Sequence, residues 1–407
     1  MLKINDLRAF LGLKMWNICK KASVVGLVAV LLSFVLGCSE KGSPAAQVEP
    51  RGMEFCKNLW LGESYGESVA KIRSVVGRDT LVKTFVLRQT ADFSRALPVE
   101  LTGATVLQVP LKRVVTLSSA QIGYMLRLGF QDKIVAVGEG KYVADSALYA
   151  RVQSGEVAEV GSGPTLSLEN VVALKPDLVM SFATGGGHDD YERINALGLP
   201  LMLTSEWQED SPLAKAEWIK LFGRLFGVEA LADSIFEQSK NLYLQAVNGG
   251  ASDAVDGGSC PRVLVGMSYG GVWYAPGGNS YTARLIKDAG GCYLWVSDTS
   301  RELQFSLEEI MLVADSADVW VNPGMFATSE DLLASEPRVK YIKAFKEKRV
   351  CQNDGRKGPG GGNDFYESAV VYPAEMLLNL RQCLKNATNG ADSIQKEFDW
   401  YHNIFIF

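Results

Sequence analysis

Histidine is the residue that this sequence has least of: His188 and His402 are the only two in 407 residues. A metal site built from several imidazoles is therefore excluded. No Cys-x-x-Cys pair occurs, which argues against a cysteine-based zinc site. Lysine and arginine nowhere cluster with interleaved aromatic residues, and the formal net charge is −5, so nucleic acid is not expected as a partner. We expect neither a resident cofactor nor a metal site made by the protein alone.

Long apolar runs are scarce as well, and the sequence has one, Ala22–Gly37, of 16 residues. This is shorter than the ~20 residues that a membrane-spanning helix needs. Two lysines precede the run and Cys38 follows it directly, a pattern typical of a cleaved signal. We predict that residues 1–38 are a lipoprotein signal ending at the lipidated Cys38. An uncleaved anchor helix is the alternative, and Met1 and Met15 are both candidate starts.

The chain that follows the signal has the size and composition of a globular protein. Residues 38–407 number 370, which corresponds to two domains of ordinary size. A content of 47 % hydrophobic and 21 % charged residues indicates a substantial core. Export permits disulfides, but the odd number and wide spacing of the remaining cysteines leave their pairing open. These cysteines are Cys56, Cys260, Cys292, Cys351 and Cys383.

One segment, residues 211–250, repeats apolar residues at helical spacing and predicts helices with one face buried along the whole length. Ser211 and Pro212 are typical of a helix start, and residues 248–250 of a helix end. Gly227 is expected to divide the segment into two helices. The periodic apolar positions are Trp218, Leu221, Phe222, Leu225, Phe226, Leu231, Ile235, Phe236, Leu242, Tyr243 and Val247.

Short apolar strands alternate with helical stretches on both sides of this segment, which favours parallel pairing. We therefore predict an α/β fold of two lobes with mostly parallel central sheets, joined by one long α-helix. A polar loop between residues 81–87 and 105–109 suggests a hairpin that opens the first lobe. The aromatic tail, residues 391–407, is expected to pack on the first lobe or on the linking helix. The predicted parts are a tether and N-terminal extension (39–79), an N-terminal lobe (80–211), the linking segment (212–250) and a C-terminal lobe with the tail (251–407).

Several motifs together resemble one known family, the substrate-binding lipoproteins of ABC importers for iron complexes and corrinoids, whose lobes are joined by one long helix. The resemblance covers roughly residues 112–385. In the first lobe it rests on Leu117-Ser118-Ser119-Ala120-Gln121, on residues 168–179 (LENVVALKPDLV) and on residues 212–220 (PLAKAEWIK). In the second lobe it rests on residues 273–281 (WYAPGGNSY), 288–291 (DAGG) and 361–368 (GGNDFYES).

The resemblance implies an exported, monomeric protein that is lipid-anchored at the cell envelope. It would capture a metal complex between its lobes and deliver it to an ABC permease. Family members have tryptophan where Tyr366 stands, glycine at Ala369, and Arg then Pro-Asp where residues 372–374 read Tyr-Pro-Ala. These departures lie beside the expected cleft, so the identity of the ligand does not carry over.

The resemblance also implies that an exposed acidic residue on each lobe meets the importer. The matching helix starts carry acidic pairs, which would otherwise only complement helix dipoles. The pairs are Asp189 and Asp190 on one lobe and Glu330 and Asp331 on the other.

Candidate ligand-binding residues lie in loops that follow strand ends, where ligands of parallel sheets bind. Each aromatic residue alone is explained as well by core packing, but their concentration in Gly-rich loops favours a binding role. Such a lining suits a complex whose metal is already coordinated, and we rank a ferric siderophore first, a corrinoid second and haem third. The candidates are Ser119, Gln121, Lys141, Tyr142, Thr165, Phe182, Trp207, Tyr269, Trp273, Tyr274, Gln304, Arg356, Asn363 and Tyr366.

Two of these candidates, Arg356 and Lys141, would meet carboxylates or a phosphate of the ligand. Haem would want an axial ligand, for which His188, Tyr142 and Tyr366 are the candidates. The glycine-rich run 358–362 would allow a close approach to the ligand, or simple flexibility.

Residues 266–270 (GMSYG) match the Gly-x-Ser-x-Gly pattern of serine hydrolases, with His402 further along the chain. A nucleophile elbow requires a helix directly after the serine, whereas the residues after Ser268 read as loop or strand. We therefore expect a binding protein and not an enzyme. A serine hydrolase using Ser268 and His402 is the alternative from another class, and a scavenger without an importer is the third.

Overall fold

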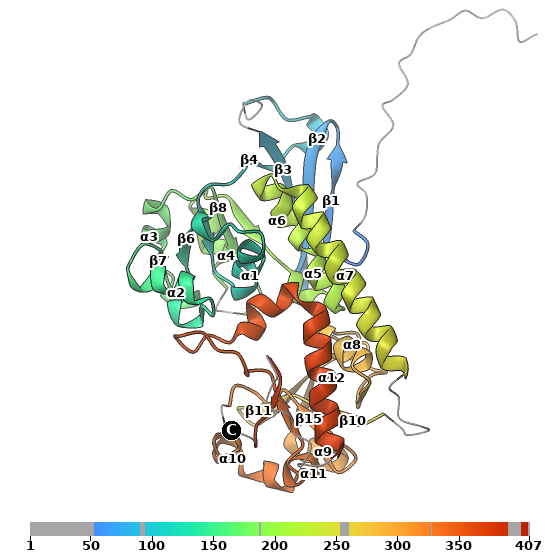
Figure 1. Ribbon diagram of the computed structural model, residues 1–407. Coiled ribbons are helices and arrows are strands. Elements are labelled where there is room, and N and C mark those ends of the chain that lie inside the picture. Colours follow the sequence, from blue (N-terminus) through green and yellow to red (C-terminus); the bar gives the residue numbers. More distant parts are fainter. Residues whose placement is uncertain are drawn as a thin grey trace, which may run out of the picture. The chain divides into compact units, whose positions relative to one another are not determined.

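The computed structural model of the chain describes residues 53–89, 94–186, 189–252, 260–326, 328–389 and 400–405 (Figure 1). The predicted signal and Cys38 lie outside these residues, so lipidation stays a prediction. No helix within the described ranges has both the length and the apolar character needed to cross a membrane. Residues 48–407 form one compact unit.

A four-stranded sheet precedes the first lobe, with strand order β1-β2-β3-β4. Its strands are β1 (Leu59–Ser64), β2 (Glu67–Val76), β3 (Asp79–Gln89) and β4 (Thr105–Val109). Two strands, β1 and the longer β2, thus fall where the sequence indicates a tether. The expected hairpin is wrong, because β3 and β4 pair in parallel and residues 90–104 are long enough for the crossover that this requires.

The N-terminal lobe contains a parallel sheet of order β7-β6-β5-β8-β9. Its strands are β5 (Val114–Thr116), β6 (Ile134–Val137), β7 (Ala158–Glu159), β8 (Leu178–Ser181) and β9 (Leu201–Leu203). Its helices are α1 (Ser119–Arg127), α2 (Ser146–Gln153), α3 (Leu168–Ala173) and α4 (Tyr191–Ala196). Short buried strands joined by single helices confirm the predicted parallel pairing.

The C-terminal lobe has a five-stranded sheet of order β13-β10-β15-β16-β17, parallel except for β17. Its strands are β10 (Arg262–Val265), β13 (Cys292–Tyr293), β15 (Val319–Val321), β16 (Val350–Gln352) and β17 (His402–Asn403). A smaller antiparallel sheet consists of β11 (Met267–Tyr269), β12 (Val272–Pro276) and β14 (Glu302–Ser306). The helices are α8 (Tyr281–Asp288), α9 (Leu307–Ala314), α10 (Ser329–Ser335), α11 (Lys343–Lys346) and α12 (Pro373–Asn389).

The described part of the aromatic tail belongs to this second lobe. Trp400 and Tyr401 are buried in its core, and β17 extends its sheet. The expectation that the tail packs on the first lobe or the linking helix is therefore wrong, because the free edge of β16 offers the tail backbone hydrogen bonds.

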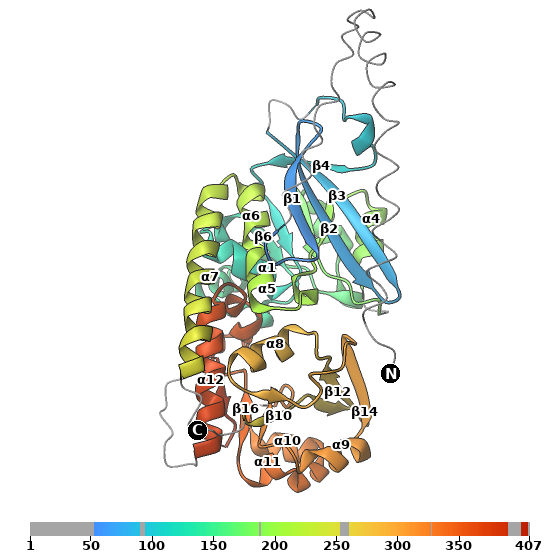
Figure 2. The same cartoon turned by 90° about the vertical axis from the view of Figure 1, so that its right-hand side faces the viewer.

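The linking segment consists of α5 (Pro212–Glu217), α6 (Ile219–Phe226) and α7 (Glu229–Ser252). The Ser211 side chain accepts a hydrogen bond from the Ala214 N–H, and Gly227 ends α6 at φ 72°, as predicted. Figure 2 shows α7 beside α6 and α12. The predicted end at residues 248–250 is wrong, because α7 continues to Ser252.

Helix α7 joins the two cores. Phe236 packs in the core of the first lobe and Tyr243 in the core of the second. The predicted buried face is interrupted, since Leu231 and Leu242 are 46 % and 44 % exposed. The buried positions are enough to anchor one helix in both lobes, which is the predicted architecture.

A second connection between the lobes is the return segment, residues 356–372, which leaves the C-terminal lobe after β16 and packs on the N-terminal lobe. Val370 and Val371 are buried in the core of the first lobe. The Glu367 carboxylate accepts hydrogen bonds from the N–H groups of Ala144 and Asp145, at 2.9 and 2.8 Å. The lobes are therefore tied twice, once by α7 and once by this segment.

Glycines let the return segment lie flat on the first lobe. A Cβ at Gly358 would be 2.5 Å from Ala144 Cα, and one at Gly362 would be 2.4 Å from the Tyr142 carbonyl oxygen. The sequence suggests a close approach to a ligand at this run, whereas the approach is to the backbone of the other lobe. Side chains at these two positions would push the lobes apart.

Two disulfides lie in the C-terminal lobe, Cys260–Cys292 and Cys351–Cys383. They settle the pairing that the sequence leaves open. Cys56 is a free, buried thiol that donates to the Ala214 carbonyl oxygen at 2.9 Å, and burial raises its pKa.

Candidate functional site

A cavity of about 620 Å³ lies between the carboxyl ends of the two parallel sheets. This volume is within the usual range for sites that enclose a small-molecule ligand. From the N-terminal lobe it is lined by Leu117, Ser118, Ser119, Ala120, Tyr142, Ser162, Phe182, Thr184, Glu206, Trp207 and Lys215. From the C-terminal lobe it is lined by Gly324, Met325, Gln352, Asn353, Asp354, Lys357, Gly361, Asn363 and Tyr366. We call it the cleft cavity.

Six of the predicted ligand-binding residues line the cleft cavity: Ser119, Tyr142, Phe182, Trp207, Asn363 and Tyr366. They come together because each follows a strand of one of the two sheets, at the edge where parallel strands end. The four rings among them are 40 to 54 % exposed, so their faces are open to a ligand. Their contact with a ligand stays a prediction.

Gln121, in contrast, belongs to the scaffold. Its side-chain oxygen accepts from the N–H groups of Leu117 and Ser118, and its amide donates to Ser181 O and Thr204 Oγ1. Gln121 is fully buried and ties the start of α1 to β8 and β9. The sequence places it at the ligand because it cannot show that all of these hydrogen bonds are made within the lobe.

Two residues of opposite charge that interact electrostatically line the cleft cavity: Glu206, which is buried, and Lys215, which is half-buried. Burial raises the pKa of Glu206 and lowers the pKa of Lys215, while each charge opposes the shift of the other. The Glu206 Oε2 atom has no hydrogen-bond partner among the described residues. The Lys215 Nζ lies 5.1 Å from the centre of the Tyr281 ring. One carboxylate and one ammonium group therefore line the cleft cavity, and the unpartnered Glu206 Oε2 atom is itself buried.

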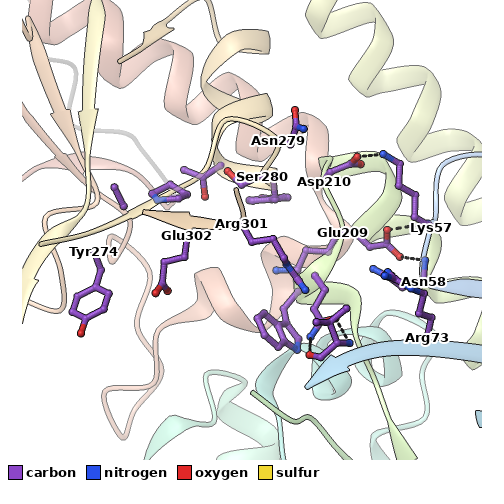
Figure 3. Close-up of a pocket in the computed structure, with 18 residues that line it drawn as sticks. Lys57, Asn58, Arg73, Glu209, Asp210, Tyr274, Asn279, Ser280, Arg301 and Glu302 are labelled. Atoms are coloured by element: carbon purple, nitrogen blue, oxygen red, sulfur yellow. Dashed lines mark hydrogen bonds and ion pairs between the residues drawn. The ribbon is translucent and has the colours of Figure 1, made fainter. Parts of the chain in front are cut away.

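A second cavity, of about 580 Å³, adjoins the first and shares Trp207 and Lys215 with it (Figure 3). We call it the side cavity. It lies between the end of β2, the loop before α5, and the start of α8 and β14. Its other lining residues are Lys57, Asn58, Arg73, Val75, Gln208, Glu209, Asp210, Tyr274, Ala275, Pro276, Asn279, Ser280, Tyr281, Thr282, Arg301 and Glu302. Of the predicted residues, Tyr274 lies here.

The structure places the other predicted ligand-binding residues away from both cavities. Trp273 is fully buried beside Trp320 and donates to the Val265 carbonyl oxygen, so it belongs to the core. Arg356 pairs with Asp364 at 3.0 Å and stacks over Trp400, beside a smaller cavity of about 400 Å³.

The remaining four candidates engage neighbouring residues or solvent. Lys141 pairs with Glu139 at 2.7 Å, and Thr165 hydrogen-bonds Ser162. Gln304 hydrogen-bonds Glu302, and Tyr269 is 73 % exposed outside both cavities. For these residues, proximity in sequence to a strand end does not bring the side chain to the cleft.

The acidic residues predicted for docking are not equally accessible. Asp190 is buried and accepts a hydrogen bond from the Gly163 N–H at 2.8 Å, and burial raises its pKa. Asp189 accepts from the N–H groups of Thr184 and Gly185. Glu330 and Asp331 are exposed at the start of α10. The expectation that Asp190 is an exposed docking residue is therefore wrong, whereas the other three keep carboxylates that reach the surface.

The Gly-x-Ser-x-Gly pattern lies in a hairpin. Ser268 is on β11, which pairs with β12 through a tight turn, so the strand-turn-helix of a nucleophile elbow is absent here. The Ser268 hydroxyl contacts Glu336, whereas His402 contacts Asp354 at 2.6 Å. Within the described ranges, no three His, Cys, Asp or Glu side chains converge as metal ligands. His188 lies outside the described residues.

Sequence reasoning missed Lys215, Glu206 and Met325 at the cleft cavity, and Arg73 and Arg301 at the side cavity. Lys215 lies in residues 212–220, one of the motifs that carry the family resemblance, and this motif could have indicated its place at the cavity. Arg73 precedes the region of resemblance, and nothing in the local sequence connects it with Arg301.

Comparison with family models matches residues 114–356 to a family described as "Periplasmic binding protein". An uncharacterized lipoprotein of Methanocaldococcus jannaschii is 24 % identical over 69 % of this chain and 66 % of its own length. A second uncharacterized lipoprotein of that organism is 25 % identical over 93 % of this chain and 97 % of its own length. A vitamin B12-binding protein of Vibrio parahaemolyticus is 31 % identical, but over 26 % of this chain and 36 % of its own length.

Several solved structures are similar to this chain in fold. An ABC-type Fe3+-hydroxamate transport protein from Saccharomonospora viridis gives a TM-score of 0.52 at 18 % identity, over 68 % of this chain and 94 % of that one. A periplasmic heme-binding protein from Roseiflexus sp. RS-1 gives 0.52 at 20 % identity, over 68 % and 99 %. At these identities the likeness shows the two-lobed fold.

Proposed function

This chain belongs to the periplasmic binding protein family, and from that we propose that it is the substrate-binding lipoprotein of an ABC importer. It captures a metal complex in the cleft cavity and delivers it to the permease without chemical turnover. The names of the two Methanocaldococcus relatives support attachment to the membrane through Cys38. The exposed acids of α10 are the surface offered to the permease on the C-terminal lobe.

The lining of the cleft cavity supports a large complex whose metal is already coordinated. Rings from both lobes, including Phe182 and Tyr366, face a space of about 620 Å³ together with neutral donors such as Asn363. A bare ferric ion needs several converging oxygen or nitrogen donors, and no three His, Cys, Asp or Glu side chains of the described residues come together in this way. Rings and amides instead suit a ligand that presents an organic surface.

We rank a ferric siderophore first, a corrinoid second and haem third. An axial ligand for haem would come from Tyr142 or Tyr366, the two phenols at the cavity. Burial raises the pKa of Tyr366, which disfavours the phenolate that would bind ferric iron. The names of the structurally similar proteins include a hydroxamate transport protein and a heme-binding protein, which supports a metal complex as the ligand. The ranking of the three complexes rests on the chemistry of the cavity lining.

Tryptophan fluorescence tests this proposal, because Trp207 lines the cleft cavity. Titration with a ferric hydroxamate, a corrinoid, haem and unchelated ferric iron should show saturable quenching by one of the complexes. In Tyr366→Ala the affinity should fall about tenfold or more, as expected when a central aromatic contact is removed.

Tyr269→Ala is the matched control, because it removes an exposed ring that lines neither cavity, and it should bind as the natural protein does. Binding of the free ion alone would overturn the proposal. Equal affinity of the two variants would show that the ligand does not bind in the cleft cavity.

A further inference from the structure

The side cavity carries more positive charge than its own acids neutralise. Lys57 pairs with Asp210. The Glu209 carboxylate accepts from the N–H groups of Lys57 and Asn58 and from Trp218 Nε1, at 3.0 to 3.1 Å, so it is committed to holding the chain before β1. Glu209 and Asp210 are therefore not free to balance the two arginines that also line the cavity. The third lining acid, Glu302, accepts a hydrogen bond from Gln304 at 3.2 Å and forms no ion pair within the described residues. Three acids thus face four basic side chains, Lys57, Arg73, Lys215 and Arg301.

Arg73 reaches the cavity from the end of β2. Strand β1 pairs with β2 only as far as Ile72, so the last residues of β2 dock on the loop before α5. There Gln208 exchanges two hydrogen bonds with the Val75 backbone, and the Ser205 hydroxyl donates to the Arg73 carbonyl oxygen at 2.6 Å. The Arg73 guanidinium donates to Asn58 Oδ1 at 3.0 Å. Its position is fixed by neutral groups.

Arg301 reaches the same cavity from the C-terminal lobe, immediately before β14. Its backbone carbonyl accepts from the Gly277 N–H at 3.0 Å, and its guanidinium lies 5.8 Å from the centre of the Trp207 ring. Figure 3 shows Arg73 and Arg301 extending into the cavity from opposite sides. In the described part of the chain, neither guanidinium forms an ion pair with a carboxylate.

The two arginines disfavour each other across the side cavity. Burial lowers the pKa of Arg301, and the neighbouring charge of Arg73 lowers it further. Two like charges that face one space gain most from an anion placed between them, because it removes their repulsion and offers charge-assisted hydrogen bonds to both. Guanidinium groups match planar oxyanions such as carboxylate or phosphate.

We propose that Arg73 and Arg301 hold an oxyanion, a carboxylate or phosphate group carried by the ligand of the cleft cavity. This proposal rests on the proposed function, since Trp207 and Lys215 line both cavities and place the two spaces side by side. It makes the N-terminal sheet part of the binding site, although β2 lies outside residues 114–356 that match the family.

The test compares the double variant R73Q/R301Q with R78Q/R338Q, both in the complete chain purified in detergent. The control pair removes the same charge from the N-terminal sheet and the C-terminal lobe. Arg78 is exposed at the turn between β2 and β3, and Arg338 forms surface ion pairs with Glu308 and Glu336. Neither residue lines the cleft cavity or the side cavity.

Two ferric complexes are titrated, one with free carboxylates, ferric citrate, and one neutral trihydroxamate, ferrichrome. The ratio of the two affinities should shift about 10- to 100-fold against the carboxylate complex in R73Q/R301Q, the loss expected for charge-assisted hydrogen bonds. In R78Q/R338Q the ratio should not change. An unchanged ratio in both variants would overturn the proposal and leave the proposed function standing.

Citrate and phosphate without iron form the second arm. A thermal shift with these anions that R73Q/R301Q loses and R78Q/R338Q keeps would support the oxyanion site. If neither ferric complex binds while these anions do, the site takes a free oxyanion, and the ferric siderophore ranked first under the proposed function is overturned instead. An equal thermal shift in both variants would overturn the oxyanion site itself.

Discussion

At the scale of single residues, Glu367 is the side chain on which the contact between the lobes most depends. Its carboxylate lies in the return segment, is 1 % exposed and accepts from two N–H groups of the other lobe. Burial raises its pKa from 4.5 to about 7, because the hydrogen bonds from Ala144 and Asp145 only partly offset the loss of water. The group therefore changes charge near neutral pH.

This shift predicts a pH dependence of stability. Between about pH 4.5 and 7 the folded protein binds more protons than the unfolded chain, so the free energy of unfolding falls as the pH rises through this range. The change amounts to at most roughly 3 kcal/mol. Urea unfolding across this range should show the decline in the natural protein and a flatter profile in Glu367→Gln.

Glu375→Gln is the control, because Glu375 is exposed at the start of α12, and its profile should match that of the natural protein. A decline of the same size in Glu367→Gln would assign the pH dependence to other groups.

At the scale of elements, the sequence predicts what depends on local pattern. Buried strands such as β8 (LVMS) and the cap at Ser211 are explained by neighbouring residues alone. The pairing of β3 with β4 and the destination of Trp400 depend on contacts far along the chain, which local pattern does not contain. The same division holds for the site, because strand ends predict Phe182 and Tyr366, whereas Arg73 and Arg301 meet only through the tertiary fold.

Gly123 in α1 shows how closely two elements can depend on each other. A Cβ at this position would be 1.9 Å from the Glu367 carbonyl oxygen and 3.3 Å from Val370. Because the nearest atom is backbone, Gly123→Ala must displace the return segment, and we expect it to lower the free energy of unfolding by about 1 to 3 kcal/mol.

Gly249→Ala is the matched control. Gly249 is also in a helix, α7, where a Cβ would meet nothing within 4 Å. Alanine should leave stability unchanged or raise it by up to about 1 kcal/mol through helix propensity. Urea unfolding of the two variants measures this difference. Equal stability of both would show that the return segment can move away from α1 without a loss of free energy of unfolding.

At the scale of the whole molecule, two connections limit how far the lobes can move. Helix α7 is anchored by Phe236 in one core and Tyr243 in the other, and the return segment adds Val370 and Val371. A helix whose side chains pack in both cores resists bending between the lobes, and two connections resist twisting. We therefore expect the two walls of the cleft to be at nearly their final separation before a ligand binds.

We accordingly predict closure by a few degrees on ligand binding, in contrast to proteins whose lobes turn about flexible strands. Small-angle X-ray scattering curves with and without a saturating ferric complex should nearly coincide. The same measurement on Gly123→Ala gives the comparison, since loosening the return segment should let the lobes spread. A large compaction of the natural protein would contradict a rigid connection.

The burial of Val370 and Val371 in the first lobe also governs the order in which the chain can be completed. More than 350 residues are synthesised before these two valines. The N-terminal lobe therefore emerges from the ribosome before two side chains of its own core have been made. The N-terminal lobe therefore cannot complete its core from its own segment, and a chain that ends after β16 lacks the two valines that pack in the core with α1. The last quarter of the polypeptide thus supplies the residues that complete the core of the N-terminal lobe.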